Sequence, residues 1–239
     1  MDITHMIELI GLDLLALVWF LIFFNGYANY ARKASYTEPC LASVMHLYRT
    51  EWMREMLQRD MRVPDTTTVA NLERGVTFFA STTMLILAGL MTLITRGETA
   101  MGLLASVPGS EVLTSLQWDL RILAMMVLFV YAFFKFTWSL RQYGFVSVMI
   151  GGAPHLSADR AKEIDTHANR IAKMASIAAN NFNIGLRSYY FAIAMLAWLI
   201  HSFLFMAVTL IVVWILYNRE FTSSTLKTLG HTEEIKTRT

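Results

Sequence analysis

The sequence predicts an all-α polytopic membrane protein with four transmembrane helices, long cytoplasmic helical extensions and both termini outside. First, the 239-residue chain is 55% hydrophobic and only 16% charged, with a mean hydropathy of +0.45, whereas soluble domains carry about a quarter charged residues. Second, four continuous apolar stretches each approach the ~20 residues that a helix needs to cross the hydrocarbon core. Third, Lys and Arg are concentrated in two of the connections between these stretches.

The predicted spans cover about residues 8–30, 72–95, 118–140 and 188–217. Continuous apolar runs favour helices, because a transmembrane β-barrel would show ten-residue alternating segments. We do not expect the first run to be a cleaved signal, since the residues before it contain no Lys or Arg. Residues 1–225 are expected to form a single membrane domain, followed by a polar tail at 226–239.

The distribution of basic residues predicts the orientation. Seven lie in the connection Tyr30–Gly75 and six in Ser139–Ser188, whereas Arg96–Asp119 contains one and the N-terminal segment none. Because loops rich in Lys and Arg stay in the cytoplasm, the first and third connections are expected there. The N-terminus, the second connection and the tail then face outward, although the tail carries four basic residues.

The basic cytoplasmic face predicts anionic lipid as a partner, at about 1 kcal/mol per residue near the surface. Nucleic acid is not expected as a partner, because the basic residues are mixed with acidic ones and no stacking platform is evident.

Both basic connections are expected to be helical. A run with an apolar face and no Gly or Pro predicts a cytoplasmic helix at about 39–61. The sequence Gly151-Gly152-Ala153-Pro154 is expected to end the third span, and Ser157 to cap a second cytoplasmic helix at about 157–187. With only Gly185 interrupting, that helix should continue into the fourth span, as one helix or two nearly collinear ones. The apolar faces of such stalks need partners, which predicts a homo-oligomer.

Ionisable residues inside the spans are candidate functional residues, because they are costly in lipid. Asp13 is expected either near the outer interface, reached by water, or paired with Arg121. Lys135 is expected to extend to the cytoplasmic interface or to line a polar cavity. His201, near the middle of the fourth predicted span, is either bonded to a neighbouring helix or part of a proton relay or ligand site.

A second candidate group lies where the spans meet the cytoplasmic side. Its members are Arg and amide residues near the cytoplasmic ends of spans two, three and four: Asn71, Arg74, Arg141, Asn180, Asn183 and Arg187. They form either an interfacial belt or a binding site or subunit junction, since Arg suits carboxylate and phosphate recognition.

The motifs that would indicate an enzyme are missing from the sequence. There is no phosphate-binding loop, dinucleotide fingerprint, nucleophile elbow or zinc-protease motif. The six histidines show no i, i+4 pair, so neither a metal nor another cofactor is expected. Cys40 is the only cysteine, which excludes a disulfide within the chain. No catalytic residue is assigned.

Several runs carry a family resemblance. FASTTMLILAGL (Phe79–Leu90), FFKFTWSLRQYGFVSVMIGGAP (Phe133–Pro154), NNFNIGLRSYYFAIAMLAWLIH (Asn180–His201) and LYNREFTSSTL (Leu216–Leu226) resemble the bacterial membrane family known as domain of unknown function 599. The resemblance covers roughly residues 10–225. It implies a multi-span protein of the bacterial inner membrane and supplies no catalytic residues, because the family has no established activity.

Three functions remain open from the sequence. The first is a homo-oligomeric structural or assembly protein whose cytoplasmic stalks pack together. The second is a channel or transporter for a small ion or anion that uses Arg and Asn residues at the cytoplasmic membrane face. The third, a lipid-acting enzyme, ranks last because no nucleophile is paired with a base.

Overall fold

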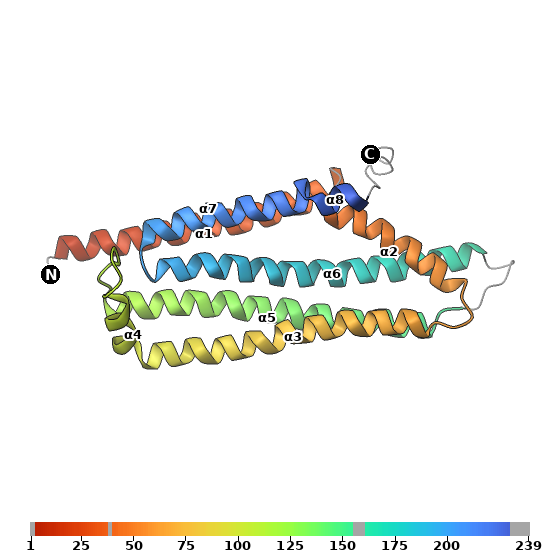
Figure 1. Ribbon diagram of the computed structural model, residues 1–239, viewed down its shortest axis with the longest axis horizontal. Coiled ribbons are helices and arrows are strands. Elements are labelled where there is room, and N and C mark those ends of the chain that lie inside the picture. The colour runs from red at the N-terminus through yellow and green to blue at the C-terminus, as the bar shows by residue number, and fades with distance from the viewer. Residues whose placement is uncertain (1–2, 38–39, 155–160, 230–239) are drawn as a thin grey trace. The chain divides into compact units, whose positions relative to one another are not determined.

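The computed structural model describes residues 3–37, 40–154 and 161–229, and every regular element within these ranges is helical (Figure 1). In chain order the elements are α1 (Ile3–Thr37), α2 (Leu41–Leu57), α3 (Val63–Thr95), α4 (Gly97–Leu104), α5 (Ser115–Gly151), α6 (Ala161–Trp198), α7 (Ser202–Tyr217), the π-helical turn η2 (Asn218–Thr222) and α8 (Ser224–Leu229). The all-helical class predicted from the sequence is therefore confirmed.

Four segments of the described chain are long and apolar enough to cross a membrane. They are Gly11–Ala34, Val63–Thr95, Ser115–Gly151 and Ser202–Leu229. Helices of this length and composition indicate a multi-pass membrane protein. The predicted cytoplasmic helix at 39–61 corresponds to α2, and α5 ends at Gly151 as expected. The predicted cap Ser157 lies outside the described residues.

The chain divides into two compact units. Unit 1 contains Met1–Lys33, Thr83–Ala132 and Leu186–Arg219, and unit 2 contains Ala34–Thr82, Phe133–Gly185 and Glu220–Thr239. The boundaries fall inside α1, α3, α5 and α6, so each of these helices contributes to both units. The single membrane domain expected for residues 1–225 remains a prediction.

Aromatic side chains form the centre of unit 1. The ring of Phe20 on α1 lies 5.6 Å from that of Phe191 on α6 and 5.4 Å from that of Phe205 on α7. Phe129 on α5 meets Tyr189 on α6 edge to face at 5.2 Å. Edge-to-face pairs are favoured by the ring quadrupole, so these contacts tie α1, α5, α6 and α7 to one another.

The helices of unit 1 alternate in direction. At one end, the start of α5 bonds to the end of α3, since Trp118 Nε1 donates to the carbonyl of Leu93 at 3.1 Å. At the other end, the hydroxyls of Thr83 on α3 and Tyr189 on α6 lie 2.8 Å apart, and the rings of Tyr30 on α1 and Tyr217 on α7 lie 6.1 Å apart. The chain therefore passes through unit 1 five times.

The prediction of one span at 188–217, continuous with the preceding helix or nearly collinear with it, is wrong. α6 ends at Trp198, and α7 begins at Ser202 and runs back along α6 (Figure 1). The stacked rings of Trp198 and Phe205, 4.9 Å apart, fix the start of this hairpin, and a hydrogen bond from Arg219 to the Tyr190 hydroxyl fixes its other end. The two helices are thus antiparallel.

Unit 2 is held by close helix packing and by side chains that bond to backbone. The rings of Phe79, Phe136 and Phe182 lie within 5.7 Å of one another and bring together α3, α5 and α6. Asn181 donates to Gln142 at 2.9 Å in the buried α5–α6 contact. Arg62 donates to the carbonyls of Ala153 and Pro154, just beyond the end of α5, which places a positive charge where helix carbonyls have no partners.

Replacing Gly185 with alanine is expected to lower the stability of unit 2. A Cβ at this position would lie 2.7 Å from Cζ and 2.8 Å from Cδ1 of the buried Phe136 ring. Such overpacking typically costs about 1–3 kcal/mol, and thermal unfolding in detergent measures it. The control is Gly144→Ala in the interior of α5, where a Cβ meets nothing within 4 Å. Equal melting temperatures for the two variants would contradict the packing.

Candidate functional site

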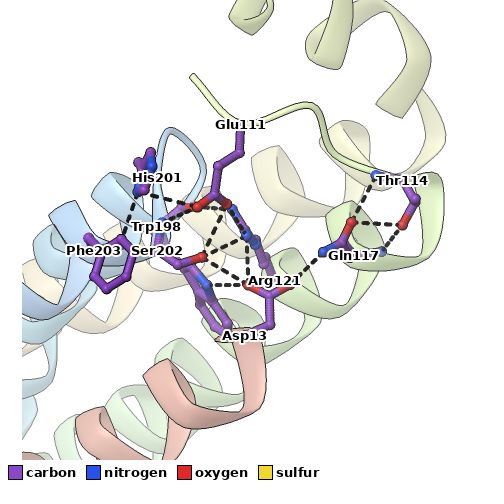
Figure 2. Close-up of polar contacts among 9 residues, drawn as sticks. All are labelled: Asp13, Glu111, Thr114, Gln117, Arg121, Trp198, His201, Ser202 and Phe203. Atoms are coloured by element: carbon purple, nitrogen blue, oxygen red, sulfur yellow. Dashed lines mark hydrogen bonds and ion pairs between the residues drawn. The ribbon is translucent and has the colours of Figure 1, made fainter. Parts of the chain in front are cut away.

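A buried ion cluster in unit 1 is centred on Arg121 of α5, whose side chain is 2% exposed (Figure 2). Its Nη2 lies 2.6 Å from Oδ1 of Asp13 on α1 and 2.7 Å from Oε2 of Glu111, which lies in the segment between α4 and α5. The same nitrogen donates to Oγ of Ser202 at 3.0 Å. Its other terminal nitrogen donates to the carbonyl of Trp198. One guanidinium thus contacts α1, α6, α7 and the segment before α5.

The cluster supplies hydrogen bonds for the turn between α6 and α7. Arg121 donates to the carbonyl of Trp198, the last residue of α6. Glu111 accepts from the Ser202 backbone N–H at 3.0 Å through its carboxylate and donates its own N–H to the carbonyl of Ile200 at 2.9 Å. Helix ends leave backbone groups without partners, and here groups from elsewhere in unit 1 satisfy them.

Asp13 is fixed by neutral donors as well as by Arg121. Trp198 Nε1 donates to its Oδ1 at 3.0 Å, and Gln117 Nε2 donates to its Oδ2 at 3.0 Å. Gln117 is itself held because its Oε1 accepts from the backbone N–H and the hydroxyl of Thr114. The carboxylate of Asp13 is therefore bound to α5 and α6 through both oxygens.

His201 lies at the exposed edge of the cluster, with 37% of its side chain exposed. Its Nδ1 is 3.1 Å from the backbone nitrogen of Phe203 and 3.2 Å from Oε1 of Glu111. A neutral ring accepts the Phe203 N–H and caps α7, whereas a protonated ring donates to Glu111.

The groups of the cluster bond mainly to one another and to helix ends. Both terminal nitrogens of Arg121 have partners within unit 1, and only its buried Nε has none. Among the residues whose side chains are described, no three His, Cys, Asp or Glu are placed to hold a metal ion. The arrangement joins helix ends and neutralises buried charge.

The structure agrees with the sequence prediction for some of the candidate residues inside the predicted spans and not for others. The pairing of Asp13 with Arg121, one of two sequence alternatives, is present. The prediction of His201 near the middle of a span is wrong, because it caps α7 at the turn. Lys135 is partly exposed in unit 2. A binding or relay role for any of these residues remains a prediction.

The structure does not gather the second candidate group into one contact site. Asn71, Arg74, Arg141, Asn180 and Asn183 belong to unit 2 and are all exposed, and none of these five side chains hydrogen-bonds to another. Arg141 instead stacks over the ring of Phe145 at 5.8 Å. Arg187 belongs to unit 1.

Sequence reasoning missed the residues that complete the cluster. Glu111 lies in a polar segment with no motif around it, and Ser202 was assigned to the interior of a span. Gln117 belongs to the sequence Thr114-Ser115-Leu116-Gln117, a capping-box pattern before an apolar run, and this signal could have found it. The asparagine with a buried partner is Asn181, rather than Asn180 or Asn183.

The opposite end of unit 1 is rich in tyrosine and arginine. The guanidinium of Arg187 lies 5.4 Å from the ring of Tyr27, and that of Arg219 lies 5.6 Å from the ring of Tyr190. Asp13 and Tyr30 are seventeen residues apart on α1, which corresponds to about 25 Å of helix. This approaches the ~30 Å thickness of the hydrocarbon core, and Tyr and Arg are typical of its interface.

The four long apolar helices indicate a helical multi-pass membrane protein. A family model described as "Protein of unknown function, DUF599" matches residues 15–225. The chain therefore belongs to this family, which confirms the resemblance seen in the sequence. No curated protein and no solved structure matches the chain.

Replacing Arg121 with methionine is expected to destabilise the protein by about 3 kcal/mol, because the largely buried carboxylates of Asp13 and Glu111 would lose their counter-charge. Thermal unfolding in detergent measures the loss. Arg96→Met is the matched control, since Arg96 is an exposed basic residue of the same unit. Adding Asp13→Asn and Glu111→Gln to Arg121→Met should recover part of the stability. An Arg121→Met protein as stable as the control would contradict this account.

Proposed function

We propose that the protein is a homo-oligomeric structural or assembly protein of the bacterial inner membrane, with no catalytic turnover. The observation that carries this proposal is the way in which the charged groups of the ion cluster are bonded within the protein. Asp13, Glu111 and Arg121 bond to each other and to the ends of α6 and α7. Groups satisfied in this way stabilise helix packing, whereas a transport pathway requires polar groups that remain available to a solute.

An exposed stripe on α5 supports the oligomeric part of the proposal. Phe134, Trp138, Phe145 and Val148 are exposed, as is Arg141 between them. Their spacing of four, three, four and three residues matches the a and d positions of a packed helix pair, in which one polar residue can set the register. We assign this α5 stripe to contact with a second copy of the chain.

The orientation that we propose places the N-terminus outside and the C-terminal tail in the cytoplasm. A tail outside was expected when residues 188–217 were read as one span. α6 is not one of the four candidate spans. Because α6 and α7 are antiparallel in unit 1, we propose that residues 186–198 of α6 also cross the membrane, so that the chain leaves it at the Tyr- and Arg-rich end. Arg32 and Lys33 follow Tyr30 at this end and are the first basic residues of the connection Tyr30–Gly75. The positive-inside rule then applies to the tail as well.

Cysteine cross-linking in membranes tests the oligomer. In a Cys40→Ser background, Val148→Cys is expected to form a disulfide-linked dimer on mild oxidation, since 74% of Val148 is exposed on the α5 stripe. Lys173→Cys, an exposed position of unit 2 on α6, serves as the control and should cross-link several-fold less. Monomers alone in native mass spectrometry, or equal cross-linking at both positions, would refute the proposed interface.

Labelling with a membrane-impermeant maleimide tests the orientation. In the same background, Val112→Cys near the ion cluster should label in intact spheroplasts. Thr225→Cys on α8, also exposed, should label only after permeabilisation. Labelling of Thr225→Cys from outside would contradict a cytoplasmic tail.

A further inference from the structure

An apolar groove in unit 1 lies between α1 and α7. It has a volume of about 490 Å³ and is lined by Ile22, Phe23, Gly26, Tyr27, Tyr30, Leu210, Val213, Trp214 and Tyr217. Its lining is almost entirely apolar, and its volume falls within the range of about 300–1,000 Å³ typical of small-molecule sites. Gly26 forms part of its floor, since a Cβ built there meets nothing within 4 Å.

One end of the groove carries tyrosine side chains, and basic residues lie next to these tyrosines in contact or in sequence. The rings of Tyr30 and Tyr217 lie 6.1 Å apart there. The guanidinium of Arg187 stacks on Tyr27, which lines the groove, and Arg219 follows Tyr217 by two residues. Arg32 and Lys33 follow Tyr30 on α1. Glu220 is the one acidic residue next to any of these four basic residues in sequence.

We propose that this groove is a specific site for an anionic phospholipid. One acyl chain lies along Ile22, Gly26 and Trp214, and the phosphate lies at the tyrosine end, within reach of Arg187 and Arg219. The chemistry of the groove favours this occupant over a helix of another protein. An acyl chain fills a narrow apolar groove beside a glycine, and a phosphate is the group that arginine forks and tyrosine hydroxyls recognise.

The site lies on helices that the proposed function places in the membrane. Gly11–Ala34 and Ser202–Leu229, which contain the groove residues, are both candidate spans. Tyrosine at the headgroup level and arginine beside it are the usual neighbours of a phosphate at the interface. The proposal rests on the membrane location of unit 1 and is independent of the α5 stripe.

Native mass spectrometry with added lipid tests the site. The full-length protein in mild detergent is titrated with phosphatidylglycerol and with phosphatidylcholine of the same acyl chains. We expect one tightly held phosphatidylglycerol per chain, with phosphatidylcholine bound at least tenfold more weakly. Gly26→Phe, which fills the groove, and Arg187→Gln, which removes a charge near the phosphate, should each weaken that binding about tenfold or more.

Matched variants separate the site from general lipid contact and from misfolding. Gly89→Phe on α3 is the control for Gly26→Phe, because Gly89 is also exposed and has equally open space. It should bind phosphatidylglycerol like the wild type, and Arg187→Lys should bind more tightly than Arg187→Gln. Circular dichroism and thermal unfolding confirm that each variant is folded.

Two results would overturn the proposal. The first is equal binding of the two lipids by the wild type. The second is unchanged phosphatidylglycerol binding in folded Gly26→Phe and Arg187→Gln. Cross-linking through Val148→Cys is measured in the same Gly26→Phe protein, so that failure of the lipid site is distinguishable from failure of the oligomer. Loss of the cross-link with unchanged lipid binding would assign the groove to a second copy of the chain instead.

Discussion

Much of unit 1 depends on a single constraint: the guanidinium of Arg121 is buried, so its positive charge needs carboxylates and hydrogen-bond acceptors close to it. A guanidinium that is 2% exposed is costly without carboxylates and hydrogen-bond acceptors around it. Asp13 and Glu111 provide the charge, and Ser202 and the carbonyl of Trp198 complete the coordination. The contacts of the Arg121 side chain therefore fix α1 at Asp13, the segment before α5 at Glu111, and the turn from α6 to α7.

That turn has consequences beyond the cluster. It converts what would have been one long span into an antiparallel pair, and so changes the number of passes through unit 1 from four to five. In the orientation that we propose, every strongly basic segment then lies on one side of the membrane, the tail included. The same reversal lays α7 beside α1, and the groove between them is the proposed lipid site. The proposed orientation and the proposed lipid site thus both depend on this turn.

The sequence predicted the helices better than their ends. Continuous apolar runs predicted the three spans within α1, α3 and α5, and Gly151-Gly152 predicted the end of α5. The pairing of Asp13 with Arg121 could be raised as one of two possibilities, because charged residues in apolar helices need partners. The role of Glu111 could not be predicted, because a single glutamate in a connection belongs to no periodic pattern and no motif. Asn180 and Asn183 were chosen although their neighbour Asn181 makes the buried bond to Gln142.

By itself, the sequence determined that this protein is helical, that it is apolar enough to cross a membrane, and that it belongs to a family of unknown function. These properties follow from composition and periodicity, which can be read from each segment of the sequence without knowledge of the tertiary structure. The tertiary structure decided where the chain turns back. Leu199-Ile200-His201 contains no glycine or proline. Just before it, the carbonyl of Trp198 accepts from Arg121. Glu111 donates its N–H to the carbonyl of Ile200 and accepts from the N–H of Ser202 through its carboxylate. His201 provides a local cap for α7, but the partners of Trp198, Ile200 and Ser202 lie far away in the sequence, so only the tertiary structure shows where the chain turns.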